Sequence, residues 1–156
     1  MLRGTSKINL DAKGRIAIPT RYRPELKESC DGQMIVTLAL DEKHTGLPGC
    51  LWLYPLHEWE KLEAFIDNLS SGNKANESVR RFIIGNANEC EMDGQGRLLL
   101  PDTLRSLVNL EKKIILSGQL KKFEIWNEEA WNQRQKEMLS GNPLDGDTSE
   151  LKRIPF

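Results

Sequence analysis

The sequence lacks the features that mark membrane, exported and disulfide-bonded proteins. None of its apolar runs approaches the roughly 20 residues of a membrane-spanning helix. Residues 1–7 contain no apolar segment of the kind that a secretory signal requires, so we expect a soluble protein that is not exported. The three cysteines, Cys30, Cys50 and Cys90, are odd in number and form no C-x-x-C pair, which argues against a disulfide framework and against a zinc ribbon.

Residues suited to catalysis or metal binding are also scarce. Histidine occurs only at His44 and His57. A site built from Cys30, His44 and Cys50 would need a fourth ligand and tighter spacing to hold a metal. No nucleophile, base and orienting residue recur in a recognisable order, and the repeat described below duplicates no such group. We therefore expect no metal, no cofactor and no enzymatic activity.

The chain also lacks an overall positive charge, because its formal net charge is −1. The charge is nevertheless unevenly distributed. Residues 1–27 contain seven basic and two acidic side chains, whereas residues 124–156 contain four basic and seven acidic ones. The beginning of the chain is therefore its basic pole, and local charge rather than net charge has to decide whether it suits nucleic acid.

What the sequence does contain is one motif written twice. Residues 11–19 read DAKGRIAIP and residues 93–101 read DGQGRLLLP, so each copy has the form D-x-x-G-R, three strand residues and proline. Gly14, and Gly96 in the second copy, can adopt a positive φ at no steric cost. This property suits a three-residue hairpin loop that ends in a left-handed bulge.

The loop length also predicts which residues of each hairpin face each other. On the exposed face Asp11 is expected to face Arg15, and in the second copy Asp93 is expected to face Arg97. The apolar pairs of the buried face are predicted to be Ile8 with Ile18, Leu10 with Ile16, Cys90 with Leu100 and Met92 with Leu98. Both copies therefore sort apolar and charged side chains onto opposite faces.

Outside the motif, each half is predicted to contain a short helix, two strands and a longer helix. The first half has helix 20–27, strands 33–40 and 51–54 and helix 56–69, and the second half has helix 102–108, strands 113–116 and 123–126 and a helix after Asn127. The two motif copies are 82 residues apart, but Trp59 and Trp131 are only 72 apart. The difference matches residues 41–50, which we interpret as a loop inserted in the first half.

This order of elements predicts an α+β, mainly β protein built from two tandem repeats. The expected units are residues 1–69 as the first repeat, 70–86 as a linker and a connecting helix capped by Asn76, 87–139 as the second repeat and 140–156 as a flexible tail. One half supplies only about four short strands, too few to enclose a core. The two halves are therefore expected to complete one small β-barrel with flanking helices.

The aromatic residues follow the predicted strand and helix faces. They are Trp52, Tyr54, Trp59, Trp126 and Trp131. Because of this spacing we interpret them as anchors of the core and of subunit interfaces rather than as platforms on which bases stack.

Several of these features together resemble the MraZ family. They are the doubled D-x-x-G-R, the opening Arg3-Gly4, Tyr54-Pro55 followed by Glu58-Trp59, and the sequence FEIW at 123–126. The similarity extends over residues 2–138. It implies an AbrB-like, swapped-hairpin barrel that is doubled within one chain and joined into a ring-shaped homo-oligomer.

The resemblance also implies a function and a site. It implies a DNA-binding transcriptional regulator in the cytoplasm, associated with the nucleoid, that binds short direct repeats in double-stranded DNA upstream of its own division and cell-wall gene cluster. In that family the D-x-x-x-R motif contacts DNA. Here this implies a role for Asp11 with Arg15 and for Asp93 with Arg97.

From the residues themselves we expect Arg15, held by Asp11, to project toward the major groove. Nearby cations that would bind phosphates are Arg3, Lys7 and Lys13. The second copy is expected to contribute less, because Gln95 replaces Lys13 and Glu89 and Glu91 bring negative charge.

Three alternative interpretations remain open, two of single side chains and one of the function. Asp11 with Arg15 is also explained as an exposed hairpin ion pair without a functional role. Arg21, Arg23 and Lys27 are best explained as the solvated face of a helix. A protein-binding scaffold or antitoxin-like module, acting through residues 140–156, is the alternative function.

Overall fold

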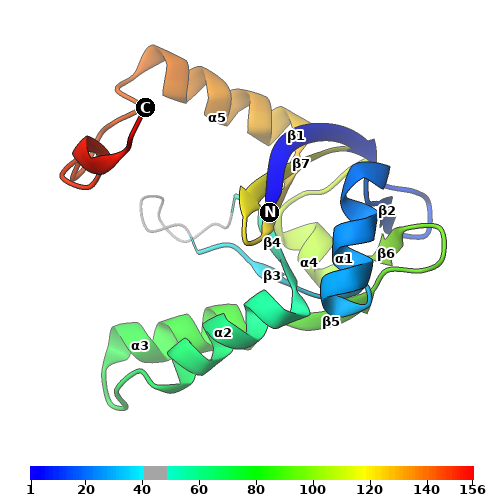
Figure 1. Cartoon of the computed structure of the whole chain (residues 1–156), viewed down its shortest axis with the longest axis horizontal. Coiled ribbons are helices and arrows are strands. Elements are labelled where there is room, and N and C mark those ends of the chain that lie inside the picture. Colours follow the sequence, from blue (N-terminus) through cyan, green and yellow to red (C-terminus); the bar gives the residue numbers. More distant parts are fainter. Residues whose placement is uncertain (41–48) are drawn as a thin grey trace.

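The structure is a computed structural model that describes residues 1–40 and 49–156 (Figure 1). The first half contains β1 (Leu2–Asn9), β2 (Arg15–Ala17), α1 (Arg23–Cys30), β3 (Gln33–Leu38), β4 (Leu51–Pro55), α2 (Leu56–Asp67) and α3 (Lys74–Val79). The second half contains β5 (Asn88–Glu91), β6 (Arg97–Leu99), α4 (Asp102–Leu107), β7 (Lys113–Leu120), β8 (Phe123–Asn127) and α5 (Glu128–Ser140). The predicted loop at 41–50 lies mostly outside the described residues.

The strands form two antiparallel sheets. Six strands are hydrogen-bonded in the order β1-β7-β8-β4-β3-β5, and β2 pairs with β6 in a separate two-stranded ribbon. In Figure 1 this ribbon lies at one end of the molecule, and α3 and α5 extend toward the other. Hydrogen bonds between the described strands therefore do not close the predicted barrel. The mixed architecture of strands and helices is as predicted.

The strand partners differ from the predicted hairpins beyond each turn. Leu10 faces Ile16 as expected, but β1 then leaves to pair with β7, so that Ile8 faces Ile114 rather than Ile18. In the second half β5 pairs with β3, so that Cys90 faces Met34 rather than Leu100. The predicted register is therefore wrong outside the turns. The physical reason is that the arms of each hairpin separate, and the backbone groups of β1, β2, β5 and β6 are satisfied by strands of the opposite half.

The two halves are related by an approximate two-fold axis. The 82-residue offset makes Ile16 and Leu98 equivalent, and these two residues face each other in the β2–β6 ribbon. The 72-residue offset makes Trp52 and Glu124 equivalent, and they face each other between β4 and β8. A residue that faces its own equivalent lies on the axis, which therefore passes through both pairs.

The main core lies beneath the ribbon. The four apolar residues predicted for its inner face, Ile16, Ile18, Leu98 and Leu100, are at most 1% exposed. Burying one such side chain contributes roughly 1.5–3 kcal/mol. The predicted inner face is thus correct even though the predicted pairing is not.

The aromatic residues form two smaller clusters with the longer helices. Trp59, Tyr54 and Trp126 are buried, and the other two tryptophans are half-buried. The rings of Tyr54 and Trp59 lie 5.8 Å apart, as do those of Trp126 and Trp131. These contacts attach α2 and α5 to the sheet. A role at a subunit interface stays a prediction.

Helix caps decide where the outer helices begin. Asn127 caps α5 as predicted, since its side chain accepts hydrogen bonds from the backbone N–H groups of Glu129 and Ala130. The cap of α3 is Asn73 rather than Asn76, because the Asn73 side chain accepts from the backbone of Ala75 and Asn76. The predicted linker is therefore helical from Lys74 onward. Across the described ranges, no helix has the length and apolar character needed to cross a membrane.

Candidate nucleic-acid interface

The first motif copy folds into a turn held together by one carboxylate. Asp11 Oδ1 accepts hydrogen bonds from the backbone N–H groups of Lys13 and Arg15, both at 2.9 Å. Asp11 Oδ2 accepts one from Arg15 Nε at 2.8 Å. The N–H of Gly14 donates to the backbone oxygen of Asp11, and φ of Gly14 is +83°. The turn thus fixes the base of the Arg15 guanidinium, while its two terminal nitrogens have no partner among the described residues.

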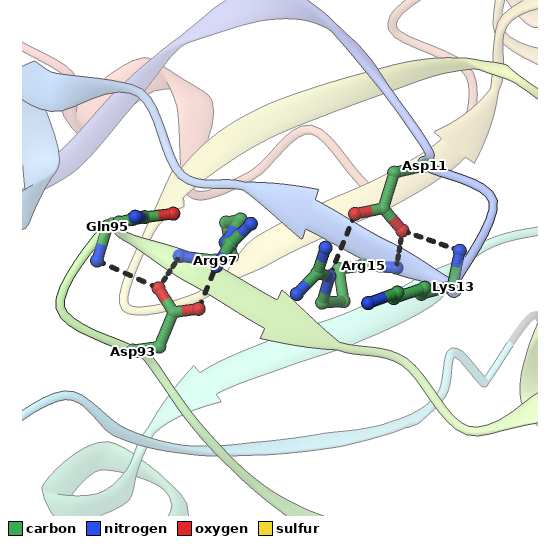
Figure 2. Close-up of polar contacts among 6 residues, drawn as sticks. All are labelled: Asp11, Lys13, Arg15, Asp93, Gln95 and Arg97. Atoms are coloured by element: carbon green, nitrogen blue, oxygen red, sulfur yellow. Dashed lines mark hydrogen bonds and ion pairs between the residues drawn. The ribbon is translucent and has the colours of Figure 1, made fainter.

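The second copy repeats these bonds (Figure 2). Asp93 Oδ1 accepts from the backbone N–H groups of Gln95 and Arg97 at 2.9 Å, and Asp93 Oδ2 accepts from Arg97 Nε at 3.0 Å. Gly96 has a φ of +76°. The turn keeps its conformation although Gln95 stands where the first copy has Lys13. Its shape therefore depends on the aspartate, the glycine and the arginine.

Both aspartates are ionised at neutral pH. The hydrogen bond from the backbone N–H of Arg15 is the main cause that lowers the pKa of Asp11, and that of Arg97 does the same to the pKa of Asp93. The side chains of the two ion pairs remain 26–40% exposed. Each motif therefore presents a neutral, oriented pair to solvent, with the arginine as its hydrogen-bond donor.

The β2–β6 ribbon brings the two motifs onto one exposed surface. Arg15 faces Leu99 and Ala17 faces Arg97, while the residues between them point into the core. Diagonal neighbours on such a face have Cα atoms roughly 7–8 Å apart, so the two arginine side chains leave the ribbon close to each other. From the sequence alone the two turns are expected to be separate sites. The structure makes them opposite ends of one ribbon.

Two further arginines, Arg23 and Arg105, adjoin the turns. They are equivalent under the 82-residue offset. Arg23 Nε donates to the backbone oxygen of Ile18 at 2.7 Å, and Arg105 Nε donates to that of Leu100 at 3.0 Å. Arg23 is therefore half-buried and held at Nε, rather than only a solvated side chain on the helix face. Its recurrence at the same step of both halves is the sequence signal that identifies it.

Each of these guanidinium groups lies against the turn glycine of the opposite half. A Cβ added to Gly14 would lie 2.7 Å from Arg105 Cζ, and one added to Gly96 would overlap Arg23. Both glycines are buried for this reason. They are thus required twice, for their positive φ and for the space that the arginine occupies.

The structure does not bring the other two predicted cations to the ribbon. Arg3 and Lys7 lie on β1, roughly 26 Å and 13 Å of extended chain before Asp11. Lys7 Nζ lies 3.7 Å from a carboxylate oxygen of Glu128, the first residue of α5. Of the predicted phosphate contacts, only Lys13 belongs to a turn.

The next observations concern possible metal ligands and the thiol of Cys90. Within residues 1–40 and 49–156, no group of three or more histidine, cysteine, aspartate or glutamate side chains is placed to hold a metal. His44, which was one of the three residues of the metal site considered with Cys30 and Cys50, lies outside the described residues. Burial raises the pKa of the Cys90 thiol to about 12, so this cysteine is not a thiolate at neutral pH.

Comparison with known proteins agrees with the doubled site. A family model described as "MraZ protein, putative antitoxin-like" matches residues 1–82 and again residues 83–153. The chain belongs to the MraZ family. A relative named transcriptional regulator MraZ, from Methylococcus capsulatus, is 47% identical over 146 residues, which are 94% of this chain and 91% of the relative. One of the same name from Yersinia pestis is 48% identical over 137 residues, 88% of this chain and 86% of the relative.

The names of these relatives bear on whether the family is regulatory or enzymatic. These MraZ relatives are named as regulators of transcription, not as enzymes. Each of the two matched ranges contains one D-x-x-G-R motif. The unit that recurs within the MraZ chain is therefore the one that carries the oriented arginine.

Proposed function

We propose that this MraZ family member is a DNA-binding transcriptional regulator that inserts the β2–β6 ribbon into the major groove. The observation that carries the proposal is the shared exposed face of Arg15 and Arg97, each fixed at Nε by an aspartate. A two-stranded ribbon fits the major groove, and the two terminal nitrogens of arginine match the O6 and N7 acceptors of guanine.

The geometry of the ribbon suits two reading positions. Diagonal neighbours in a two-stranded ribbon have Cα atoms roughly 7–8 Å apart, which corresponds to about two base-pair steps of about 3.4 Å each. Because the carboxylates hold both guanidinium groups before DNA arrives, binding costs less side-chain entropy. The aspartates therefore act as positioning residues for the arginines.

One ribbon offers few phosphate contacts, so repeated contact belongs to the proposal. We propose that several copies form a ring that presents identical ribbons to short direct repeats upstream of the division and cell-wall gene cluster. Once one ribbon is bound, the ring raises the effective concentration of the others at the neighbouring repeats. The protein would act in the cytoplasm, on the nucleoid. The exchange of strands between halves supports an AbrB-like, swapped-hairpin relationship.

The test is a titration of labelled DNA from upstream of the gene at several salt concentrations. For a regulator that contacts phosphates, log affinity falls steeply with log salt. Arg15→Ala is expected to abolish specific binding, whereas Arg81→Ala, at an exposed arginine outside the ribbon, is expected to bind like the wild type. Equal binding by both variants would refute the ribbon as the interface.

The alternative function is protein binding through the C-terminal segment. Exposed apolar side chains on α5 and after it, such as Leu139 and Phe156, favour a protein partner. A scaffold of this kind would show no salt-dependent DNA affinity. The same titration therefore separates the two functions.

A further inference from the structure

The two turns of the ribbon differ in which of their cations are paired with a carboxylate. At the first turn no described carboxylate pairs with Lys13, while Arg105 is paired with Asp102, whose Oδ1 lies 2.6 Å from Arg105 Nη2. At the second turn Gln95 is uncharged, and the adjoining arginine is Arg23. Within the described residues no carboxylate pairs with Arg23, because Thr20 occupies the position equivalent to Asp102. Each turn thus has, beside its Asp–Arg pair, one cation that no carboxylate of residues 1–40 and 49–156 neutralises.

We propose that Arg23 binds a backbone phosphate of double-stranded DNA at the second turn, where it supplies the unpaired cation that Lys13 supplies at the first. This inference rests on the proposed function and identifies a contact that the D-x-x-G-R motif does not contain. It also revises the expectation that the second copy contributes less. The cation missing at Gln95 is supplied by the opposite half of the chain.

The contacts of Arg23 suit a phosphate ligand. Its Nε is held by the backbone oxygen of Ile18, so the two terminal nitrogens remain as a preoriented pair of donors. Paired N–H groups of arginine bind phosphate oxygens in a bidentate manner. The position is on the flank of the ribbon, beside Gly96, where a phosphate contact would fix the orientation of the ribbon on the duplex.

A groove with basic residues in its wall lies next to Arg23. Its volume is about 460 Å³, and it lies between α1 and the second turn. Arg23 and Lys27 contribute positive charge to its wall. Three acidic residues, Glu28, Asp31 and Asp93, also line the groove. Asp93 is paired with Arg97, and Glu28 and Asp31 lie about 8 Å and 12 Å of helix away from Arg23. None of the three is paired with Arg23, which lies at the end of the groove next to the ribbon.

The test gives Arg23 an acidic partner like the one that Arg105 has. Thr20→Asp gives Arg23 the carboxylate that Asp102 gives Arg105, without removing its bond to Ile18. The slope of log affinity against log salt is expected to become shallower by about 0.9 for each ribbon in contact with DNA. Ser71→Asp adds the same charge at an exposed site between α2 and α3 and is expected to leave the slope unchanged.

The reciprocal variant tests the same inference from the other turn. Asp102→Asn, at a side chain that is 91% exposed, frees Arg105 and is expected to steepen the slope by about 0.9 per ribbon. If Thr20→Asp proves unstable in thermal unfolding, Arg23→Gln removes the same charge and is expected to make the slope shallower by the same amount. Unchanged slopes in the folded variants, with wild-type binding that Arg15→Ala abolishes, would overturn the role of Arg23 and leave the proposed function standing. Absence of DNA binding by the wild type would overturn both.

Discussion

Alanine substitution at the turn glycines tests the geometry of the site directly. In Gly14→Ala the new Cβ must accept a φ of +83°, which costs about 1–2 kcal/mol in the left-handed region. It also displaces Arg105, whose Cζ would lie 2.7 Å away, and so breaks the bond from Nε to Leu100, worth about 0.5–1.5 kcal/mol. We therefore expect a loss of about 2 kcal/mol in the free energy of unfolding.

The motif provides its own control for this substitution. Gly94 occupies the position that Ala12 takes in the first copy, its φ is not positive and nothing lies within 4 Å of an added Cβ. Gly94→Ala is expected to be neutral or to stabilise by up to about 1 kcal/mol, because alanine lowers the entropy of the unfolded chain.

The assay is urea and thermal unfolding at one fixed protein concentration, since subunit association shifts the apparent stability. A loss of about 2 kcal/mol lowers Tm by roughly 4–8 °C in a protein of this size. Gly96→Ala should resemble Gly14→Ala, because Gly96 has the same positive φ and contacts Arg23. If Gly14→Ala and Gly94→Ala have equal stability, the crossed contact between arginine and turn is refuted.

Two further predictions concern pH and base recognition. The folded-state pKa values of Asp11 and Asp93 are lowered, so their contribution to stability is complete above the unfolded value of about 3.9 and is lost as the pH falls through the folded values. The double variant Asp11→Asn with Asp93→Asn should therefore be less stable than the wild type at pH 7 in urea unfolding, and the difference should shrink as the pH falls below about 3.9; a constant difference would contradict this. Leu99 is 57% exposed and faces Arg15, which suits contact with a thymine methyl group. Replacing thymine by deoxyuridine in the target DNA should weaken the wild type but not Leu99→Ala, and an equal loss in both would exclude the contact.

The turns were predictable because their chemistry is local. The aspartate, the glycine and the arginine lie within five residues, and the hydrogen bonds that define the turn connect only those residues and the one before the glycine. The same information predicts which side chains are buried, since alternation along a strand does not depend on the partner. Ile16 and Leu98 were therefore placed on the correct face.

The strand partners were not predictable by the same reasoning. A hairpin rule pairs Ile8 with Ile18, and nothing in the two strands distinguishes this pairing from that of Ile8 with Ile114, because all three side chains are apolar and β-branched. The choice depends on the combined core of both halves. The role of Arg23 is not predictable for a related reason, because its contact with Gly96 exists only once the halves have exchanged strands.

The two-fold axis through Ile16 and Leu98 has a consequence for how the protein meets a DNA repeat. Turning the ribbon end for end exchanges Arg15 with Arg97 and leaves the exposed guanidinium groups in nearly the same places. The arginines alone therefore cannot tell one direction along the duplex from the other. Polarity has to come from the pairs that the two halves do not share, Ala17 with Leu99 and Lys13 with Gln95. A chain with identical halves would bind its repeats in either sense.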